Sequence, residues 1–194
     1  MNEPRHNGAI DPGTDAVLAA TRRWLELAVI GLNLCPFAKA VYVKDQVRIV
    51  STDTTSPEQL LAQLGEELLH LRDTPAEQTD TTLLVHPHVL QDFLDYNDFL
   101  DQADALVEAL ELDGVLQVAS FHPDYRFADS APDDIENYSN RAPWPILHLL
   151  REDSVGRAVD AYPDADVIVE RNYATLRQLG HDGWRRRFEG GSSS

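Results

Sequence analysis

The sequence predicts an α/β fold in which a short, mostly parallel sheet is flanked by helices, with extra helices towards the C-terminal end. Residues 47–51, 81–85 and 115–121 are short β-branched or apolar segments, and two long segments with helical spacing of apolar residues separate them. Each intervening segment is long enough to return the chain, so the three strands can run parallel. An antiparallel, α+β arrangement of the same elements is the alternative.

The first predicted element is a helix over residues 14–30, because apolar side chains recur there at helical spacing. Gly31 is a plausible stop signal, and Pro36 prevents the helix from continuing without a kink. Two β-branched runs follow, at residues 41–43 and 47–51. They predict either a hairpin or a loop followed by one strand.

The second predicted helix has the strongest local signal in the chain. Ser56 is suited to cap the helix, Pro57 suits its first position, and Gln59 completes a capping box. Leucines then recur at helical spacing as far as Leu71. After the strand at 81–85, a further long run of apolar residues at helical spacing predicts the third helix.

The last third of the chain begins with a loop. Residues 123–143 are polar and contain prolines, which predicts a long ordered loop of the kind that often carries function. We expect helices to resume at residues 145–152, 154–161 and 173–180.

The length and composition suit one globular domain. The chain has 194 residues, of which 43% are hydrophobic, and a chain of this length buries about 70% of its unfolded surface. We expect a single domain over residues 14–189. Residues 1–13 lack periodicity and predict a flexible leader, and residues 190–194 contain only Gly and Ser and predict a flexible tail.

The charge balance excludes some classes of partner. The 16 Lys and Arg residues against 33 Asp and Glu residues give a net charge of −17. A surface this acidic repels phosphate backbones and anionic lipids, so we expect no nucleic-acid or membrane partner and instead a small-molecule ligand. The chain shows neither a signal-peptide pattern nor a long apolar run, and Cys35 is its one cysteine, so a cytoplasmic location is expected. The oligomeric state is left open.

Two of the predicted strands end in the same way, at a His-Pro pair. His86 follows the strand at 81–85, and His122 follows the strand at 115–121, with Asp124 two residues later. If these strands are parallel, both histidines emerge at the carboxyl edge of one sheet. Open α/β sheets place their ligands at that edge.

His148 and Glu152 extend this cluster. They lie four residues apart in the predicted helix at 145–152, a spacing at which two side chains on one helical face can share a metal ion. Imidazole together with carboxylate suits Zn, Fe or Mn. The sequence therefore predicts a candidate metal centre, and its ligands would be His86, His122, Asp124, His148 and Glu152.

Arg141 and Cys35 are the remaining candidates for chemistry. Arg141 could hold an anionic group of a substrate, or it could anchor the long loop to an acidic residue. Cys35 follows the first helix and is either a buried small hydrophobic residue or a nucleophile. As a nucleophile it would use His122 or His148 as its base.

Three sequence segments together resemble a known family. They are LCPFA at residues 34–38, FHPDY at residues 121–125, and NRAPWPILHLLRE at residues 140–152. The chain resembles, over about residues 16–182, an uncharacterised bacterial family classed as a domain of unknown function. The resemblance implies a cytoplasmic bacterial protein of one domain, and it implies no activity.

These observations leave competing hypotheses for function. The leading one is a small-molecule enzyme centred on His122, Asp124 and His148, which works either with a metal that activates water or with the histidines as acid and base. A thiol enzyme centred on Cys35 is the second. The third is a non-catalytic module that binds a metabolite or protein through the loop at 123–143. Its site would be shallow and lined by Tyr125, Phe127 and Tyr138, with the histidines in structural hydrogen bonds.

Overall fold

The computed structural model describes residues 13–161 and 165–189, so the predicted tail at 190–194 and all of the predicted leader except Gly13 lie outside the described residues. The helices are α1 (Gly13–Trp24), the π-helix η1 (Leu25–Ile30), α2 (Ala38–Tyr42), α3 (Pro57–Asp73), α4 (Phe93–Ala109), the 3₁₀-helix η2 (Ile135–Ser139), α5 (Glu152–Ala161) and α6 (Ala165–Glu189). The strands are β1 (Val47–Ser51), β2 (Thr81–Val85), β3 (Leu116–Phe121) and β4 (Ile146–Arg151). None of the described helices is both long and apolar enough to span a membrane.

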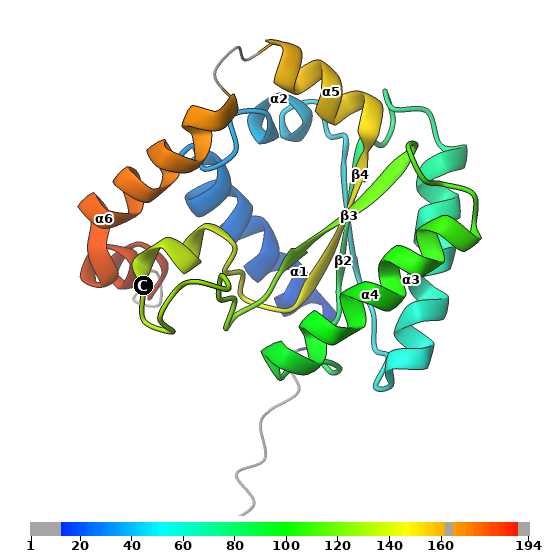
Figure 1. Ribbon diagram of the computed structural model, residues 1–194, viewed down its shortest axis with the longest axis horizontal. Coiled ribbons are helices and arrows are strands. Elements are labelled where there is room, and N and C mark those ends of the chain that lie inside the picture. The colour runs from blue at the N-terminus through cyan, green and yellow to red at the C-terminus, as the bar shows by residue number, and fades with distance from the viewer. Residues whose placement is uncertain (1–12, 162–164, 190–194) are drawn as a thin grey trace, which may run out of the picture.

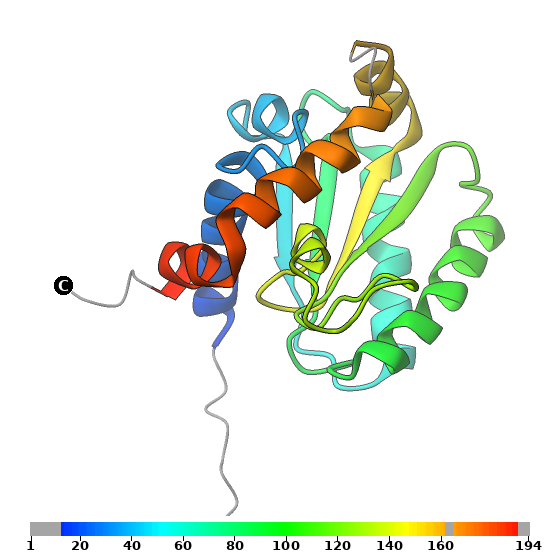
Figure 2. The same cartoon turned by 60° about the vertical axis from the view of Figure 1, so that its left-hand side comes forward.

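The sheet is mixed, so the expectation of a mostly parallel sheet was wrong. Its strand order is β1-β2-β4-β3, with β1 parallel to β2 and β4 antiparallel to both of its neighbours. Because β2 and β3 both oppose β4, the three strands predicted from the sequence still run in one direction. Helices cover both faces of the sheet, α3 and α4 on one side and α1 and α6 on the other (Figures 1 and 2).

The helix predicted at residues 145–152 was wrong, because this segment forms β4. Ile146, Leu147 and Leu149 are fully buried, with Leu147 and Leu149 packed on one face of the sheet and Ile146 on the other. A short run that is apolar on both faces suits a central strand, which buries both sides. The 41–43 segment is also not a strand, since it lies at the end of the short helix α2.

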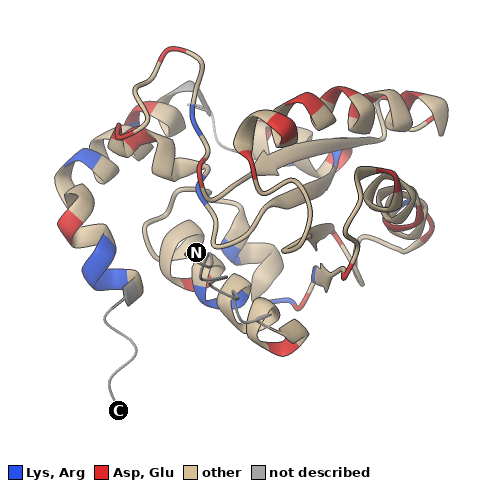
Figure 3. Cartoon of the chain, turned by 90° about the horizontal axis from the view of Figure 1, so that it is seen from below, with Lys and Arg blue, Asp and Glu red and all other residues tan. Residues whose placement is uncertain are grey.

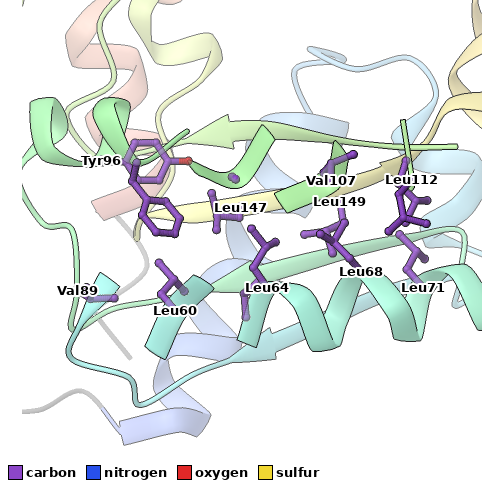
Figure 4. Packing of buried hydrophobic residues seen from close by; sticks show 14 residues of the cluster. Leu60, Leu64, Leu68, Leu71, Val89, Tyr96, Val107, Leu112, Leu147 and Leu149 are labelled. Atoms are coloured by element: carbon purple, nitrogen blue, oxygen red, sulfur yellow. The ribbon is translucent and has the colours of Figure 1, made fainter. Parts of the chain in front are cut away.

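The face covered by α3 and α4, called the α3–α4 face below, is closely packed. Leu60, Leu64, Leu68 and Leu71 follow one side of α3 and are fully buried against the sheet and α4 (Figure 4). The predicted helix start is confirmed, because the Ser56 side chain accepts a hydrogen bond from the backbone N–H of Gln59 at 3.3 Å.

The opposite face, called the α1–α6 face below, is built from segments far apart in the chain. α1 continues into the π-helix, and the chain then turns through Asn33, which has a φ of 54°. The backbone N–H groups of Leu34 and Cys35 both donate to the carbonyl of Val29, which closes the helix end. α6 crosses this face and is broken at Gly180, whose φ of 62° and ψ of 173° are not helical.

The long loop after β3 is ordered around one buried side chain. Asn137 is fully buried, and its Oδ1 accepts hydrogen bonds from the Phe127 backbone N–H at 3.1 Å and the Ser130 hydroxyl at 2.7 Å. Its Nδ2 donates to the carbonyl of Ala131 at 2.8 Å. An asparagine side chain that forms hydrogen bonds with the backbone groups of a loop in this way holds the loop in one conformation.

Candidate functional site

The two His-Pro strand ends lie at the same edge of the sheet, although β4 separates β2 from β3. Both histidines are fully buried and face α4, with the ring of Tyr96 near both of them. The ring centroids of His86 and Tyr96 are 5.7 Å apart, and those of Tyr96 and His122 are 5.1 Å apart. The topology therefore brings these two imidazoles into one cluster.

The imidazoles are held by main-chain groups. His86 Nδ1 donates to the carbonyl of Val89 at 3.0 Å. His122 Nδ1 accepts a hydrogen bond from the Asp124 backbone N–H at 3.0 Å, so the proton is on Nε2, which donates to the carbonyl of Leu90 at 3.2 Å. Both rings thus fasten the loop that follows β2, and the Asp124 side chain is exposed.

Burial also disfavours the charged form of both imidazoles. It lowers the pKa of His86 to about 4, and it lowers the pKa of His122 as well. His86 Nε2 is buried and has no hydrogen-bond partner among the described residues. Both residues are fully buried, so neither ring exposes a nitrogen at the surface.

His148 lies on the opposite face of the sheet. It is the third residue of β4, and its ring centroid is 5.8 Å from that of Phe121. Its Nε2 donates to Thr81 Oγ1 at 2.8 Å, and the Thr81 hydroxyl donates to the carbonyl of Leu149 at 2.7 Å. Burial lowers the pKa of His148 to about 4.

The predicted metal ligands do not form one centre. Glu152 is the first residue of α5 and follows β4, so the helical spacing from His148 does not exist. Within residues 13–161 and 165–189, no three His, Cys, Asp or Glu side chains form a group that could hold a metal ion. The structure gives the predicted Zn, Fe or Mn centre no support.

Arg141 ties the long loop together. Its guanidinium donates from Nε to the carbonyl of Tyr125 at 3.2 Å and from Nη2 to the carbonyl of Pro132 at 2.7 Å. It also lies over the ring of Tyr138, 4.4 Å from the centroid. These contacts match one of the two predicted roles, the anchoring of the loop, with carbonyl groups rather than a carboxylate as partners.

Cys35 lines a cavity of about 280 Å³ on the α1–α6 face. The polar residues around it are Cys35, Ser139, Asn140, Asn172 and Tyr173, and the apolar residues are Val29, Leu34, Phe121, Phe127 and Val169. These come from the π-helix and the turn after it, the end of β3, the long loop and α6. The cavity therefore lies where segments from four parts of the chain meet.

Asn172 joins α6 to the Cys35 turn and was not predicted as a site residue. Its Nδ2 donates to the carbonyl of Leu34 at 2.8 Å, and the neighbouring Arg171 donates to the carbonyl of Asn33 at 3.0 Å. Asn172 Oδ1 is buried and has no partner among the described residues. No sequence signal linked this asparagine to Cys35, which is 137 positions earlier in the chain.

The predicted pairing of Cys35 with a histidine does not form. In the described part of the chain, the Cys35 thiol makes no hydrogen bond to His122 or His148. His122 lies on the other face, and His148 Nε2 is already bonded to Thr81. A cysteine nucleophile needs such a base or another activating group.

Comparison with known proteins identifies the family. No curated protein and no solved structure matches the chain. Residues 16–186 match the family described as "Protein of unknown function (DUF1415)", which agrees with the resemblance inferred from the three sequence segments. Because the match covers most of its length, the chain belongs to this family.

Proposed function

We propose that this protein binds a small molecule in the Cys35 cavity and acts there as a non-catalytic module. One observation carries the proposal. The cavity is formed by the turn at Cys35, by Phe127 and Asn140 of the long loop, and by Asn172 of α6, whose Oδ1 has no hydrogen-bond partner among the described residues. A buried acceptor without a partner is costly, and a small rotation of the Asn172 amide toward the cavity would let a ligand N–H or O–H group satisfy it.

The shape and lining of the cavity favour a particular kind of ligand. At about 280 Å³ it is slightly below the range of about 300–1,000 Å³ typical of drug-sized ligand pockets. Among the residues that the structure describes, no Asp, Glu, Lys or Arg lines it. We therefore expect a small, uncharged molecule, mostly apolar, that carries at least one hydrogen-bond donor.

The engagement of the histidines favours binding over catalysis. His86, His122 and His148 all bond to neighbouring protein groups, and burial lowers the pKa of each. The hypothesis of an enzyme centred on His122, Asp124 and His148 therefore lacks its geometric basis. A site in the long loop with structural histidines was the alternative, and the Cys35 cavity uses Phe127 from that loop.

The experiment is a binding screen by amide NMR on the folded chain. Pools of small neutral amides, alcohols and heterocycles are added, and we expect at least one pool to shift the resonances of Cys35, Phe127 and Asn172. Asn172→Ala should weaken that binding, and Asn97→Ala, an exposed asparagine on α4, should not. Shifts that occur only outside the cavity, or no shifts with any pool, would contradict the proposal.

A thiol enzyme is the second candidate, because the one cysteine of the chain lines the cavity. The thiol-enzyme hypothesis requires an unusually reactive Cys35 thiol, whereas the hypothesis of non-catalytic binding does not. An activated thiol reacts with iodoacetamide faster than a cysteine in a short unstructured peptide at the same pH. We expect Cys35 in the folded protein to be labelled no faster than the cysteine of the peptide. Mass spectrometry of the intact protein would follow the labelling.

A further inference from the structure

A second cavity, of about 350 Å³, lies on the α1–α6 face and shares no lining residue with the Cys35 cavity. It is formed by α1, by the long loop and by the end of α6. The residues that matter here are two arginines and four aromatic residues: Arg23, Trp24, Tyr138, Arg141, Trp184 and Phe188. It is called the Arg–aromatic cavity below.

The aromatic residues form the walls of this cavity. The Trp184 ring lies edge-on to Tyr138, with centroids 5.0 Å apart, and 4.4 Å from the ring of Phe188. Trp24 donates its indole N–H to the carbonyl of Arg141 at 2.9 Å, so its remaining surface is apolar. Rings in these arrangements favour contact with a flat aromatic ligand.

The charge of the cavity contrasts with that of the whole chain. Although the sequence contains 33 Asp and Glu residues, no acidic residue of the described part of the chain lines the cavity. Neither Arg23 nor Arg141 forms an ion pair with any described residue. Figure 3 shows acidic residues spread over the helices and loops, and basic residues at the C-terminal end of α6 as well as at scattered positions elsewhere. The cavity is thus locally positive in an acidic protein.

The arginines keep hydrogen-bonding capacity. Arg141 uses Nε and Nη2 for loop carbonyls, and no described residue accepts a hydrogen bond from its Nη1. Among the described residues, Arg23 makes one long hydrogen bond, from Nη2 to the carbonyl of Phe188 at 3.5 Å. Guanidinium groups recognise carboxylates through paired N–H donors.

We propose that the Arg–aromatic cavity binds an aromatic carboxylate. The aromatic walls would hold the flat ring, and Arg23 and Arg141 would hold the carboxylate. Phosphate alone would leave the aromatic surface unused, and a nucleic acid would be repelled by the net charge of −17. This site goes beyond the ligand site proposed at Cys35.

The test uses 2-naphthoate and its neutral analogue 2-naphthamide as probes, with the indole N–H resonances of the three tryptophans as the readout. Trp24 and Trp184 line the cavity, whereas Trp144 does not. We expect 2-naphthoate to shift the first two signals and to leave the third in place. Because a hydrogen bond to a charged group contributes about 1.5–3 kcal/mol, 2-naphthamide should bind at least about tenfold more weakly.

Substitutions of single arginines test whether the charge at the cavity, rather than packing alone, contributes to 2-naphthoate binding. Arg23→Gln removes one charge from an exposed side chain without touching the loop, and should weaken 2-naphthoate binding by about tenfold. Arg22→Gln, the adjacent exposed arginine outside the cavity, should bind like the wild type. Equal binding of the two probes, an unchanged affinity in Arg23→Gln, or the absence of shifts at Trp24 and Trp184 would each overturn the proposal. Binding should persist after Cys35 is alkylated, so failure at one cavity is distinguishable from failure at the other.

Discussion

The two faces of the sheet differ in how they are filled. On the α3–α4 face, leucines of α3 at helical spacing are fully buried against α4 and the strands, and the two histidines at its edge bond to the adjacent loop. The α1–α6 face holds both cavities, the π-helix and the break at Gly180.

The contrast follows from the way each face is assembled. The α3–α4 face is built from two long helices that connect consecutive strands of the same direction. The α1–α6 face brings together the first helix, the long loop and the last helix, which are far apart in sequence and irregular in shape. Irregular segments pack with gaps, and ligand sites tend to occupy such gaps. The first face therefore serves stability, and the second is the place to look for function.

The largest effect is expected from a cavity made in the α3–α4 face. Leu64 is fully buried, so Leu64→Ala should lower the free energy of unfolding by about 2–5 kcal/mol, measured by urea denaturation. Leu94→Ala, at a leucine of α4 that is 61% exposed, is the control and should change it by less than about 0.5 kcal/mol. Equal effects of the two substitutions would remove the contrast between the packed interior and the surface.

Acid should weaken the fold through its buried histidines. The pKa of His86 falls from 6.5 to about 4 on burial, so at pH values between these two the unfolded chain binds a proton that the folded chain does not. Above pH 6.5 the ring is neutral in both states and contributes no pH dependence. Stability should therefore fall as the pH drops from 6.5 to 4, by on the order of 2–3 kcal/mol for this residue.

The measurement is the free energy of unfolding against pH in the wild type and in His86→Gln. Removing the imidazole should reduce the slope between pH 6.5 and 4 by the share of His86, while His148, whose pKa is also lowered to about 4, keeps its own share. His70→Gln, at an exposed position of α3, should keep the wild-type slope. If His86→Gln shows the wild-type slope as well, the buried imidazole is not what makes the protein sensitive to acid.

A smaller loss is expected on the α1–α6 face. Asn137→Ala removes three hydrogen bonds that hold the long loop, and should cost about 1–3 kcal/mol of stability. It should also expose residues 123–143 to protease, which limited proteolysis followed by mass spectrometry would detect. A loop that stays as resistant as in the wild type would mean that other contacts, such as those of Arg141, hold it.

The smallest effect on stability is expected at the Cys35 cavity. Tyr173 is only half-buried and contacts Phe127 with centroids 6.3 Å apart, so Tyr173→Ala should change stability by less than about 1 kcal/mol. Because it widens the cavity, it should speed the alkylation of Cys35 by iodoacetamide. An unchanged rate would show that Tyr173 does not limit access to the thiol.

Local sequence signals predicted the elements whose structure depends on near neighbours. The capping residues before α3, the helical spacing of α1 with its π-helix, and the β-branched runs of β1 and β2 all form as expected. The segment at 145–152 was mistaken for a helix, since six residues that are apolar on both sides suit a buried helix or a central strand equally. The segment forms a strand because it pairs with β2 and β3. These strands are distant in the sequence, so the local pattern carries no information about them.

By itself, the sequence determined the positions of α3, β1 and β2, the acidic charge and the family. It also placed His86 and His122 at the ends of strands of one direction. Only the tertiary structure decided that β4 lies between those strands, that His148 faces the opposite side of the sheet, and that Asn172 meets the Cys35 turn. The reason is that helix caps and side-chain periodicity act over a few residues, whereas strand order and cavities depend on contacts between distant segments.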